Sequence, residues 1–355
     1  MLEIRCSGTP YEIGFQHGSA AKPLVAGSMA FYEDLFKQSC NLDWPGVCKE
    51  ASRYTPALET LCPRYLDEMR GVADGAGVTL VDIIALNVRT EITFGLFTDQ
   101  PSTPVKMDGC TALSCKDDAG TSFLAQNWDW MREQRPNLVV CHISQPGTCM
   151  PDLSMVTEAG VIGKIGLNSK GVGVCLNAIR ARGVDPSKLP VHLALRTVLE
   201  SPSREAAVGS LKEMGVAGSA HLLVADETGS VGLEFTINGL QELPMDDRSR
   251  VIHSNHLLLD HPGVDEPPWL PDSPFRALRL RKLAEEQFSA APVTVAGIFE
   301  LFKDEDGYPG AINRCQVGES YFETLFNIVM DLSAKSAMVS FGRATEYSER
   351  VQFAF

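Results

Sequence analysis

Residues 106–110 read Lys-Met-Asp-Gly-Cys, and they join a polar, proline-containing run at 98–104 (TDQPSTP) to an apolar segment that begins TALSC at residue 111. A loop of that composition exposes its backbone to solvent. Glycine before cysteine gives a peptide bond with little steric cover, and a cysteine thiolate can attack the glycine carbonyl. The stretch therefore predicts an exposed, chemically reactive bond between Gly109 and Cys110.

The chain before this loop has the pattern of helices. Thr9-Pro10-Tyr11-Glu12 is a capping box with proline at the first helical position, and it predicts a helix that runs toward Phe36. Thr79 opens a second such start, after which Leu80, Ile83, Ile84 and Val88 fall on one helical face. We expect residues 9 to about 92 to be helical.

The chain after Cys110 has the pattern of short strands. Turn residues separate apolar runs at 122–128, 137–144, 154–160, 161–167 and 171–177, and Asn168–Gly171 is a good hairpin turn. Helices are expected at about 190–213 and 273–302, and further strands at 221–226, 231–236, 250–255, 324–331 and 337–341. This order predicts stacked α and β layers with antiparallel sheets in one domain.

Composition limits the classes of partner. The 355 residues carry a formal net charge of -14 without a basic cluster, which disfavours nucleic acid or an anionic membrane and favours a small-molecule substrate. Ten scattered cysteines without metal-binding spacing favour free thiols in a reducing compartment. We find no signal peptide, no apolar run of membrane-spanning length and no peroxisomal tripeptide at Val351–Phe355, and we expect a cytoplasmic protein.

Two interpretations of Cys110 follow from the residues alone. A cysteine that begins a strand is often a small buried apolar side chain. Alternatively, an N-to-S acyl shift followed by hydrolysis would cut the chain before Cys110. Its new α-amino group, with a reference pKa of about 7.7–8.0, would then act as the base for its own thiol.

Eight blocks along the chain carry a resemblance to a known family. They are 8–22 (GTPYEIGFQHGSAAK), 86–91 (LNVRTE), 108–112 (DGCTA), 125–130 (AQNWDW), 157–174 (TEAGVIGKIGLNSKGVGV), 191–201 (VHLALRTVLES), 253–256 (HSNH) and 324–328 (TLFNI). In this order they resemble the acyl-coenzyme A:6-aminopenicillanic acid acyltransferase (isopenicillin N acyltransferase) family, which is similar to the N-terminal-nucleophile hydrolases. The resemblance implies an α+β fold, a four-layer αββα sandwich. It also implies self-cleavage into an α fragment of residues 1–109 and a β fragment of 110–355, which stay together as a heterodimer.

The resemblance also assigns candidate site residues. It places the Asp129 carboxylate beside Cys110, where the new α-ammonium would be the partner that a buried carboxylate needs; the alternative is a turn aspartate. It makes Asn255 an oxyanion-hole donor. Asn177 would lie near the pocket, or else make only a cross-strand hydrogen bond. Trp130 and Met131 would line an acyl pocket, although on sequence alone they look like core residues.

One departure from the family pattern concerns the residues before TLFNI. The family carries a Ser-Arg pair there, whereas this chain has Ser320 and Tyr321, so a neutral phenol replaces a permanent charge. A penicillin nucleus is therefore a doubtful substrate, and a neutral or amphipathic one is expected. Arg314 lies nearby, but the family has an arginine there too, and we expect Arg314 to be a surface charge.

The leading hypothesis is acyl transfer through a thioester on Cys110, from acyl-CoA or an amide to an amine in secondary metabolism. An amidase with water as the acceptor is the nearest alternative. An unprocessed cysteine hydrolase with His253 or His256 as base, and a non-enzymatic binding protein, are the others; no GxSxG supports a serine hydrolase. We expect no cofactor and no metal, since His253, His256 and His261 fit no zinc spacing.

Overall fold

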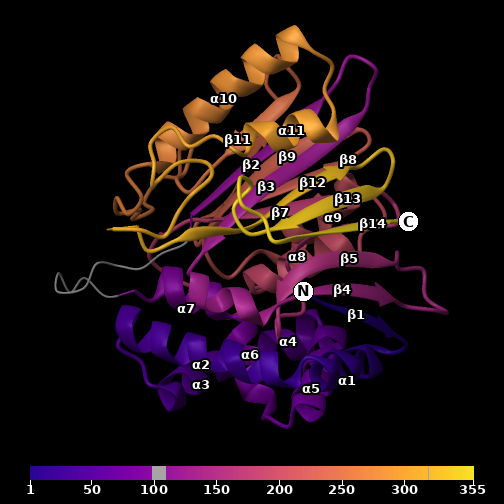
Figure 1. The fold of residues 1–355 in the computed structure, drawn as a ribbon. Coiled ribbons are helices and arrows are strands. Elements are labelled where there is room, and N and C mark those ends of the chain that lie inside the picture. Colours follow the sequence, from indigo (N-terminus) through magenta and orange to yellow (C-terminus); the bar gives the residue numbers. More distant parts are fainter. Residues whose placement is uncertain (98–108, 319) are drawn as a thin grey trace.

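Two β-sheets lie face to face between two layers of helices (Figure 1). The computed structural model describes residues 1–97, 109–318 and 320–355. The arrangement is the predicted α+β, four-layer αββα sandwich. Most of the predicted exposed loop, at 98–108, lies outside the described residues, so its exposure stays a prediction.

The first sheet, sheet A, combines one strand from the N-terminal end of the chain with strands that follow residue 137. In strand order it contains β1 (Leu2–Ser7), β4 (Leu138–Ser144), β5 (Leu153–Glu158), β6 (Ile165–Asn168), β7 (Gly173–Ala178), β8 (Ala220–Asp226), β9 (Gly229–Thr236) and β10 (Gly239–Pro244). β1 and β4 pair in parallel, and the later neighbours pair antiparallel. The N-terminal segment is thus built into a sheet of the C-terminal part.

The second sheet, sheet B, begins directly after the region outside the description. In strand order it contains β11 (Arg250–His253), β2 (Gly109–Lys116), β3 (Ser122–Trp130), β12 (Glu323–Asp331), β13 (Ser336–Phe341) and β14 (Glu349–Ala354). Its described pairs are antiparallel, and β2 and β3 pack against β7 and β8 of sheet A. The inner strands of the two sheets form the centre of the molecule.

The helices cover the outer faces of the two sheets (Figure 1). Sheet A is covered by α1 (Pro10–Ala20), α2 (Lys22–Ser39), α3 (Trp44–Ser52), α4 (Thr55–Leu61), α5 (Pro63–Ala76), α6 (Leu80–Asn87), α7 (Arg89–Gly95), α8 (Val191–Leu199) and α9 (Arg204–Met214). Sheet B is covered by α10 (Ser273–Ala290) and α11 (Val295–Leu301), and a short 3-10 helix spans Arg132–Asn137. No helix within 1–97, 109–318 or 320–355 is long and apolar enough to cross a membrane.

Three predicted helices are each divided in two, and a proline stands near each break. The helix expected to run from Pro10 toward Phe36 is interrupted at Ala21 because Pro23 lacks an N–H and its ring clashes with the preceding turn. Pro202 separates α8 from α9, and Pro292 separates α10 from α11. The predicted capping boxes at Thr9 and Thr79 are confirmed.

Three strands were not predicted, and each buries few side chains. β1 and β14 bury only two side chains each, and the residues of β10 are exposed or half-buried. In contrast, the predicted hairpin is confirmed: β6 and β7 pair across the turn, where Gly171 has φ +81°. The strand predicted to begin at Val161 begins at Ile165.

Strand β2 presents its side chains alternately to the two sides of sheet B. Ser114 hydrogen-bonds Ser230 of β9, so its face is turned toward sheet A. Leu113 and Cys115 belong instead to the apolar cluster under α10 and α11. Since alternate residues share a face, Cys110 is turned toward sheet A and Thr111 toward α10.

Helices α1 and α5 pack with their backbones in close contact, and glycines make that contact possible. A methyl group on Gly71 would lie 2.1 Å from the carbonyl oxygen of Tyr11, and one on Gly14 would lie 1.9 Å from that of Glu68. The packing of the first helix therefore depends on the absence of these side chains.

Gly71→Ala should lower the free energy of unfolding by about 1–3 kcal/mol, because the clash with backbone outweighs the better helix propensity of alanine. Gly209→Ala is the matched control: Gly209 lies in α9 with nothing within 4 Å of the added methyl group. It should raise the free energy of unfolding by up to about 1 kcal/mol. Chemical denaturation followed by circular dichroism measures both, and a stabilising Gly71→Ala would contradict the packing described.

Candidate active site

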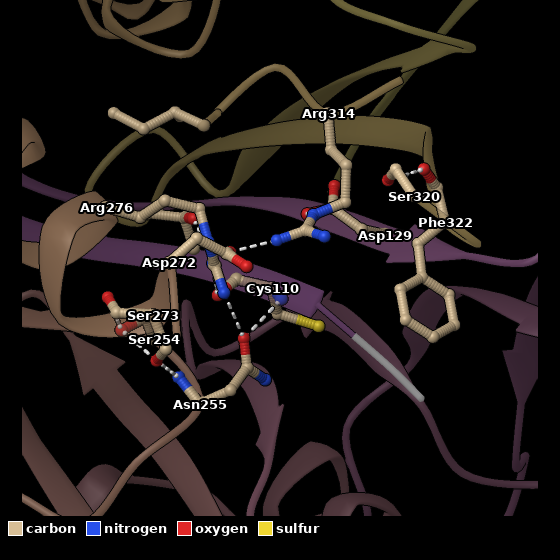
Figure 2. A network of polar contacts seen from close by, with 12 residues as sticks. Cys110, Asp129, Ser254, Asn255, Asp272, Ser273, Arg276, Arg314, Ser320 and Phe322 are labelled. Carbon is tan, nitrogen blue, oxygen red and sulfur yellow. Dashed lines mark hydrogen bonds and ion pairs between the residues drawn. The ribbon is translucent and has the colours of Figure 1, made fainter. Parts of the chain in front are cut away.

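Cys110 stands at the second position of β2 and is fully buried. Its backbone N–H donates to the side-chain oxygen Oδ1 of Asn255, 2.7 Å away (Figure 2). The structure thus brings together the predicted nucleophile and the predicted oxyanion-hole residue, which are 145 positions apart in the chain.

Asn255 is held from several directions. It follows the end of β11, and its backbone N–H donates to Oγ of Ser273 at 2.7 Å. Trp269 Nε1 donates to its carbonyl oxygen at 3.1 Å. The side-chain Nδ2 donates to the carbonyl oxygen of Ala178, at the end of β7, at 3.1 Å. The amide therefore joins the start of β2 in sheet B to β7 in sheet A.

Asp129 lies opposite Gly109 in the pairing of β2 with β3. A methyl group on Gly109 would be 3.3 Å from Asp129 Oδ2 and 3.0 Å from Arg314 Nε, so the two charged groups lie against the glycine. Thr324 Oγ1 donates to Asp129 Oδ1 at 2.7 Å. Asp129 is a fully buried strand residue, and the alternative of a turn aspartate is wrong.

Arg314 was expected on the surface, and this expectation is wrong. Arg314 is 3% exposed, its Nε lies 3.6 Å from Asp129 Oδ2, and its Nη2 forms an ion pair with Asp272. Burial, together with the charge of Arg276, lowers the pKa of Arg314 from its ordinary value. Arg314 lies between α11 and β12, outside any helix or strand, so no periodic pattern indicates from the sequence that it is buried.

Arg276 and Asp272 were not identified from the sequence. Arg276 is fully buried and donates to Cys110 O at 2.7 Å, to Thr111 Oγ1 at 2.8 Å and to Asn255 Oδ1 at 2.9 Å (Figure 2). Its Nε donates to Asp272 Oδ2 at 2.7 Å. Burial would raise the pKa of Asp272, but the guanidinium groups of Arg276 and Arg314 hold it below its usual value. In sequence this is an i, i+4 pair at a helix start, which is usually a surface feature.

The histidines of the HSNH segment make contacts of their own. His253 Nδ1 lies 2.8 Å from the carbonyl oxygen of Ser254, and its Nε2 lies 2.8 Å from Glu234 Oε1. His261 Nε2 lies 2.9 Å from the other oxygen of Glu234, and His256 Nδ1 lies 2.8 Å from Ser273 Oγ. Among the residues that the structure describes, no group of three His, Cys, Asp or Glu side chains is arranged to hold a metal ion.

Asn177 makes the cross-strand hydrogen bond that was one of its two interpretations. Its Oδ1 lies 2.9 Å from Nδ1 of His221, its partner on β8. The His221 ring in turn stacks on His253, with ring centroids 3.5 Å apart. Asn177 is therefore part of a buried polar group between the sheets.

The other predicted pocket residues lie near Phe322. The Trp130 ring is fully buried and stacks on Phe322 at 6.0 Å, with Phe31 and Phe94 also against it. Met131 and Tyr321 are half-buried and pack against the main core. Ser320 Oγ donates to the carbonyl oxygen of Phe322 at 3.3 Å. Trp130 thus contacts aromatic rings from both sides of the predicted cleavage point.

A double-mutant cycle tests whether Arg314 is the buried countercharge of Asp129. Arg314→Met and Asp129→Asn should show a coupling of about 1–3 kcal/mol in the free energy of unfolding, because removal of either partner leaves a buried charge. Each chain would also carry Cys110→Ala, which removes the thiol that the predicted self-cleavage needs. The exposed pair Arg70–Asp67, at 2.9 Å, is the matched control and should couple more weakly. Equal coupling in the two pairs would contradict the assignment.

Comparisons with known proteins agree with the fold and the resemblance. The family model described as acyl-coenzyme A:6-aminopenicillanic acid acyl-transferase matches residues 115–346. The acyl-coenzyme A:6-aminopenicillanic-acid-acyltransferase 40 kDa form of Emericella nidulans is 38% identical over 358 residues, which cover 100% of this chain and 96% of the relative.

Solved structures of two variants of conjugated bile acid hydrolase from Clostridium perfringens show the same fold. Their TM-scores are 0.51 and 0.50, each at 14% identity over 69% of this chain and 92% of the other. With the match of the family model and the full-length relative, the chain belongs to the acyl-coenzyme A:6-aminopenicillanic acid acyltransferase family, and is an enzyme of the acyltransferase and amidohydrolase type.

Proposed function

We propose that this enzyme cuts itself between Gly109 and Cys110 and then transfers acyl groups through a thioester on Cys110. The observation that carries the proposal is the set of contacts around this one peptide bond. The N–H of Cys110 is held by Asn255 Oδ1 at 2.7 Å, while Asp129 and Arg314 lie against Gly109. Polar and charged groups of this kind are buried only where they have partners or a chemical role.

Self-cleavage needs only the chain itself and water. The Cys110 thiolate attacks the carbonyl carbon of Gly109, the C–N bond breaks, and the released nitrogen takes up the proton that the thiol gave up. The resulting thioester joins the Gly109 acyl group to Cys110 Sγ. Water hydrolyses it to a Gly109 carboxylate and a free thiol. The products are the fragments 1–109 and 110–355.

Acyl transfer would then use the new N-terminus as its base. The α-amino group takes the thiol proton while Sγ attacks the carbonyl of the donor, and it passes that proton to the leaving group. Asn255 Nδ2 donates to the oxyanion. An acceptor amine then attacks the thioester, gives up a proton through the α-amino group, and restores the Cys110 thiol. With water as the acceptor the same steps make the enzyme an amidase.

Substrate choice depends on the residues on the Phe322 side of the site. The relative from Emericella nidulans is named for acyl-coenzyme A and 6-aminopenicillanic acid. We propose acyl-CoA or an amide as donor, and an amine of secondary metabolism as acceptor. Tyr321 stands where the family has an arginine, so a neutral or amphipathic acceptor fits better than a penicillin nucleus. The other proposed pocket residues are Trp130, Met131, Asn177 and Ser320.

One observation disfavours a rival mechanism, and another explains how the cleaved fragments would stay together. Both ring nitrogens of His253 face oxygen atoms of Ser254 and Glu234, which disfavours His253 as the base of a Cys–His pair. The two fragments would also stay joined, because β1 pairs with β4 and the fully buried Arg89 lies 2.9 Å from Glu158. The proposed active form is therefore a heterodimer of residues 1–109 and 110–355.

Intact mass measured under denaturing conditions tests self-cleavage. The wild-type protein should give two fragments that correspond to 1–109 and 110–355, and Cys110→Ala should stay one chain of 38.6 kDa. Cys115→Ala is the matched control, since Cys115 is a buried cysteine on the other face of the same strand. It should cleave like the wild type. An uncut wild-type protein that is nevertheless active would refute the mechanism and favour an unprocessed cysteine hydrolase.

Loss of the oxyanion donor should affect turnover more than binding. With hexanoyl-CoA as the donor and release of the CoA thiol as the signal, Asn255→Ala should lower kcat about 10²–10³-fold with little change in KM. The thermal midpoint of the variant shows whether the fold is kept. An unchanged kcat in a folded, cleaved variant would remove Asn255 from the mechanism.

A further inference from the structure

Arg276 makes more contacts at the reactive segment than the proposed mechanism uses. Its guanidinium group is fully buried and touches the carbonyl oxygen of Cys110, the hydroxyl of Thr111 and the side-chain oxygen of Asn255, at 2.7–2.9 Å. Figure 2 shows the guanidinium between Asp272 and the Asn255 amide. A buried arginine at this place needs an explanation beyond surface charge.

We propose that Arg276 is a positioning residue with two effects. It fixes which end of the Asn255 amide faces Cys110, and its charge keeps the α-amino group of the cleaved Cys110 unprotonated. The proposal rests on the proposed function, since that amino group exists only after self-cleavage.

The first effect follows from donor and acceptor chemistry. The N–H of Cys110 and the guanidinium group of Arg276 can only donate, so the atom that they share on Asn255 must be the oxygen. The amide nitrogen must then point the other way, toward Ala178 at 3.1 Å. One N–H of Nδ2 is used there, and the other is the donor that the proposed mechanism offers to an oxyanion. Without Arg276 a single donor would hold the oxygen, and a rotation of the amide would move that second N–H away from the oxyanion.

The second effect follows from the charges around the Cys110 nitrogen. That nitrogen and Arg276 Nη2 lie 2.7 and 2.9 Å from the same oxygen atom, so an ammonium there would stand beside a buried guanidinium. Like charges disfavour protonation and lower the pKa of an amine. Arg314 acts in the same direction, while Asp129 and Asp272 act against it. An amine in its neutral form is what a general base requires.

Arg276 is held in place by Asp272, which Arg314 also contacts. Asp272 therefore keeps a cationic partner when Arg276 is replaced, and the substitution does not leave a buried carboxylate without a countercharge. A lysine could supply the charge, but it lacks the planar fork that reaches Cys110, Thr111 and Asn255 together.

The test measures protonation of the α-amino group without a substrate. Acetaldehyde condenses with an N-terminal cysteine: the free amine attacks the aldehyde, water leaves, and the thiol closes a thiazolidine ring. The mass of the 110–355 fragment follows the reaction, whose rate falls at low pH as the amine becomes protonated.

Compared with the wild type, Arg276→Gln should move this fall to higher pH by about one unit, and Asp272→Asn should move it to lower pH. Arg276→Lys should leave it near the wild-type pH but turn over hexanoyl-CoA more slowly at unchanged KM. Arg279→Gln is the matched control. Arg279 lies one turn further along α10 and pairs with Asp304 at 2.7 Å, away from Cys110, so its loss should change neither property.

Each result separates the inference from the proposed function. A wild-type protein that does not cleave overturns the proposed function. If the wild type cleaves, and the thiazolidine reaction slows at the same pH in the wild type, in Arg276→Gln and in Asp272→Asn, the charge effect of Arg276 is overturned. The proposed function is not affected by that result. If Arg276→Gln folds, by its thermal midpoint, but does not cleave, the positioning effect is supported, and Asp272→Asn decides the charge effect. Unchanged turnover in Arg276→Lys would refute the positioning effect.

Discussion

The hydrogen bond from the Cys110 backbone to Asn255 Oδ1 is the contact on which the arrangement of the site depends. The other end of the same amide reaches the carbonyl oxygen of Ala178, so one buried side chain ties β2 of sheet B to β7 of sheet A. A misplaced amide would leave donors and acceptors unpaired between the sheets, where that costs most. The packing of the two sheets and the geometry of the reactive segment are therefore set together.

Four charged residues continue outward from this contact. Their charges alternate in sign in the order Arg276, Asp272, Arg314 and Asp129. The charged atoms of consecutive residues in this order lie within 4 Å of each other. Alternation lets a site hold several buried charges, because each carboxylate has a guanidinium beside it. The same charges face the two sides of one peptide bond, Gly109–Cys110. In the proposed enzyme they would first surround the bond that breaks and later the amine that acts as base.

The sequence predicts the layers of this fold better than its site. Capping boxes at Thr9 and Thr79 and the hairpin turn at Asn168–Gly171 are local signals, and the structure has all three. Weak strands such as β10, with hardly any buried face, give no periodic signal. The site residues also differ in how far the sequence predicts them. The resemblance located Cys110, Asp129 and Asn255, which lie in short ordered blocks. Arg276 and Arg314 look like surface charges in sequence, and only tertiary packing buries them.

Trapping the intermediate would show whether acyl groups pass through Cys110. The enzyme would be mixed with hexanoyl-CoA, quenched in acid and mapped by peptide mass spectrometry. We expect a hexanoyl group on the N-terminal Cys110 of the 110–355 fragment, held as a thioester while the sample stays acidic, because an unprotonated α-amino group would otherwise take the acyl group from sulfur. Release of CoA with no acyl group on Cys110, or with the acyl group on another residue, would contradict it.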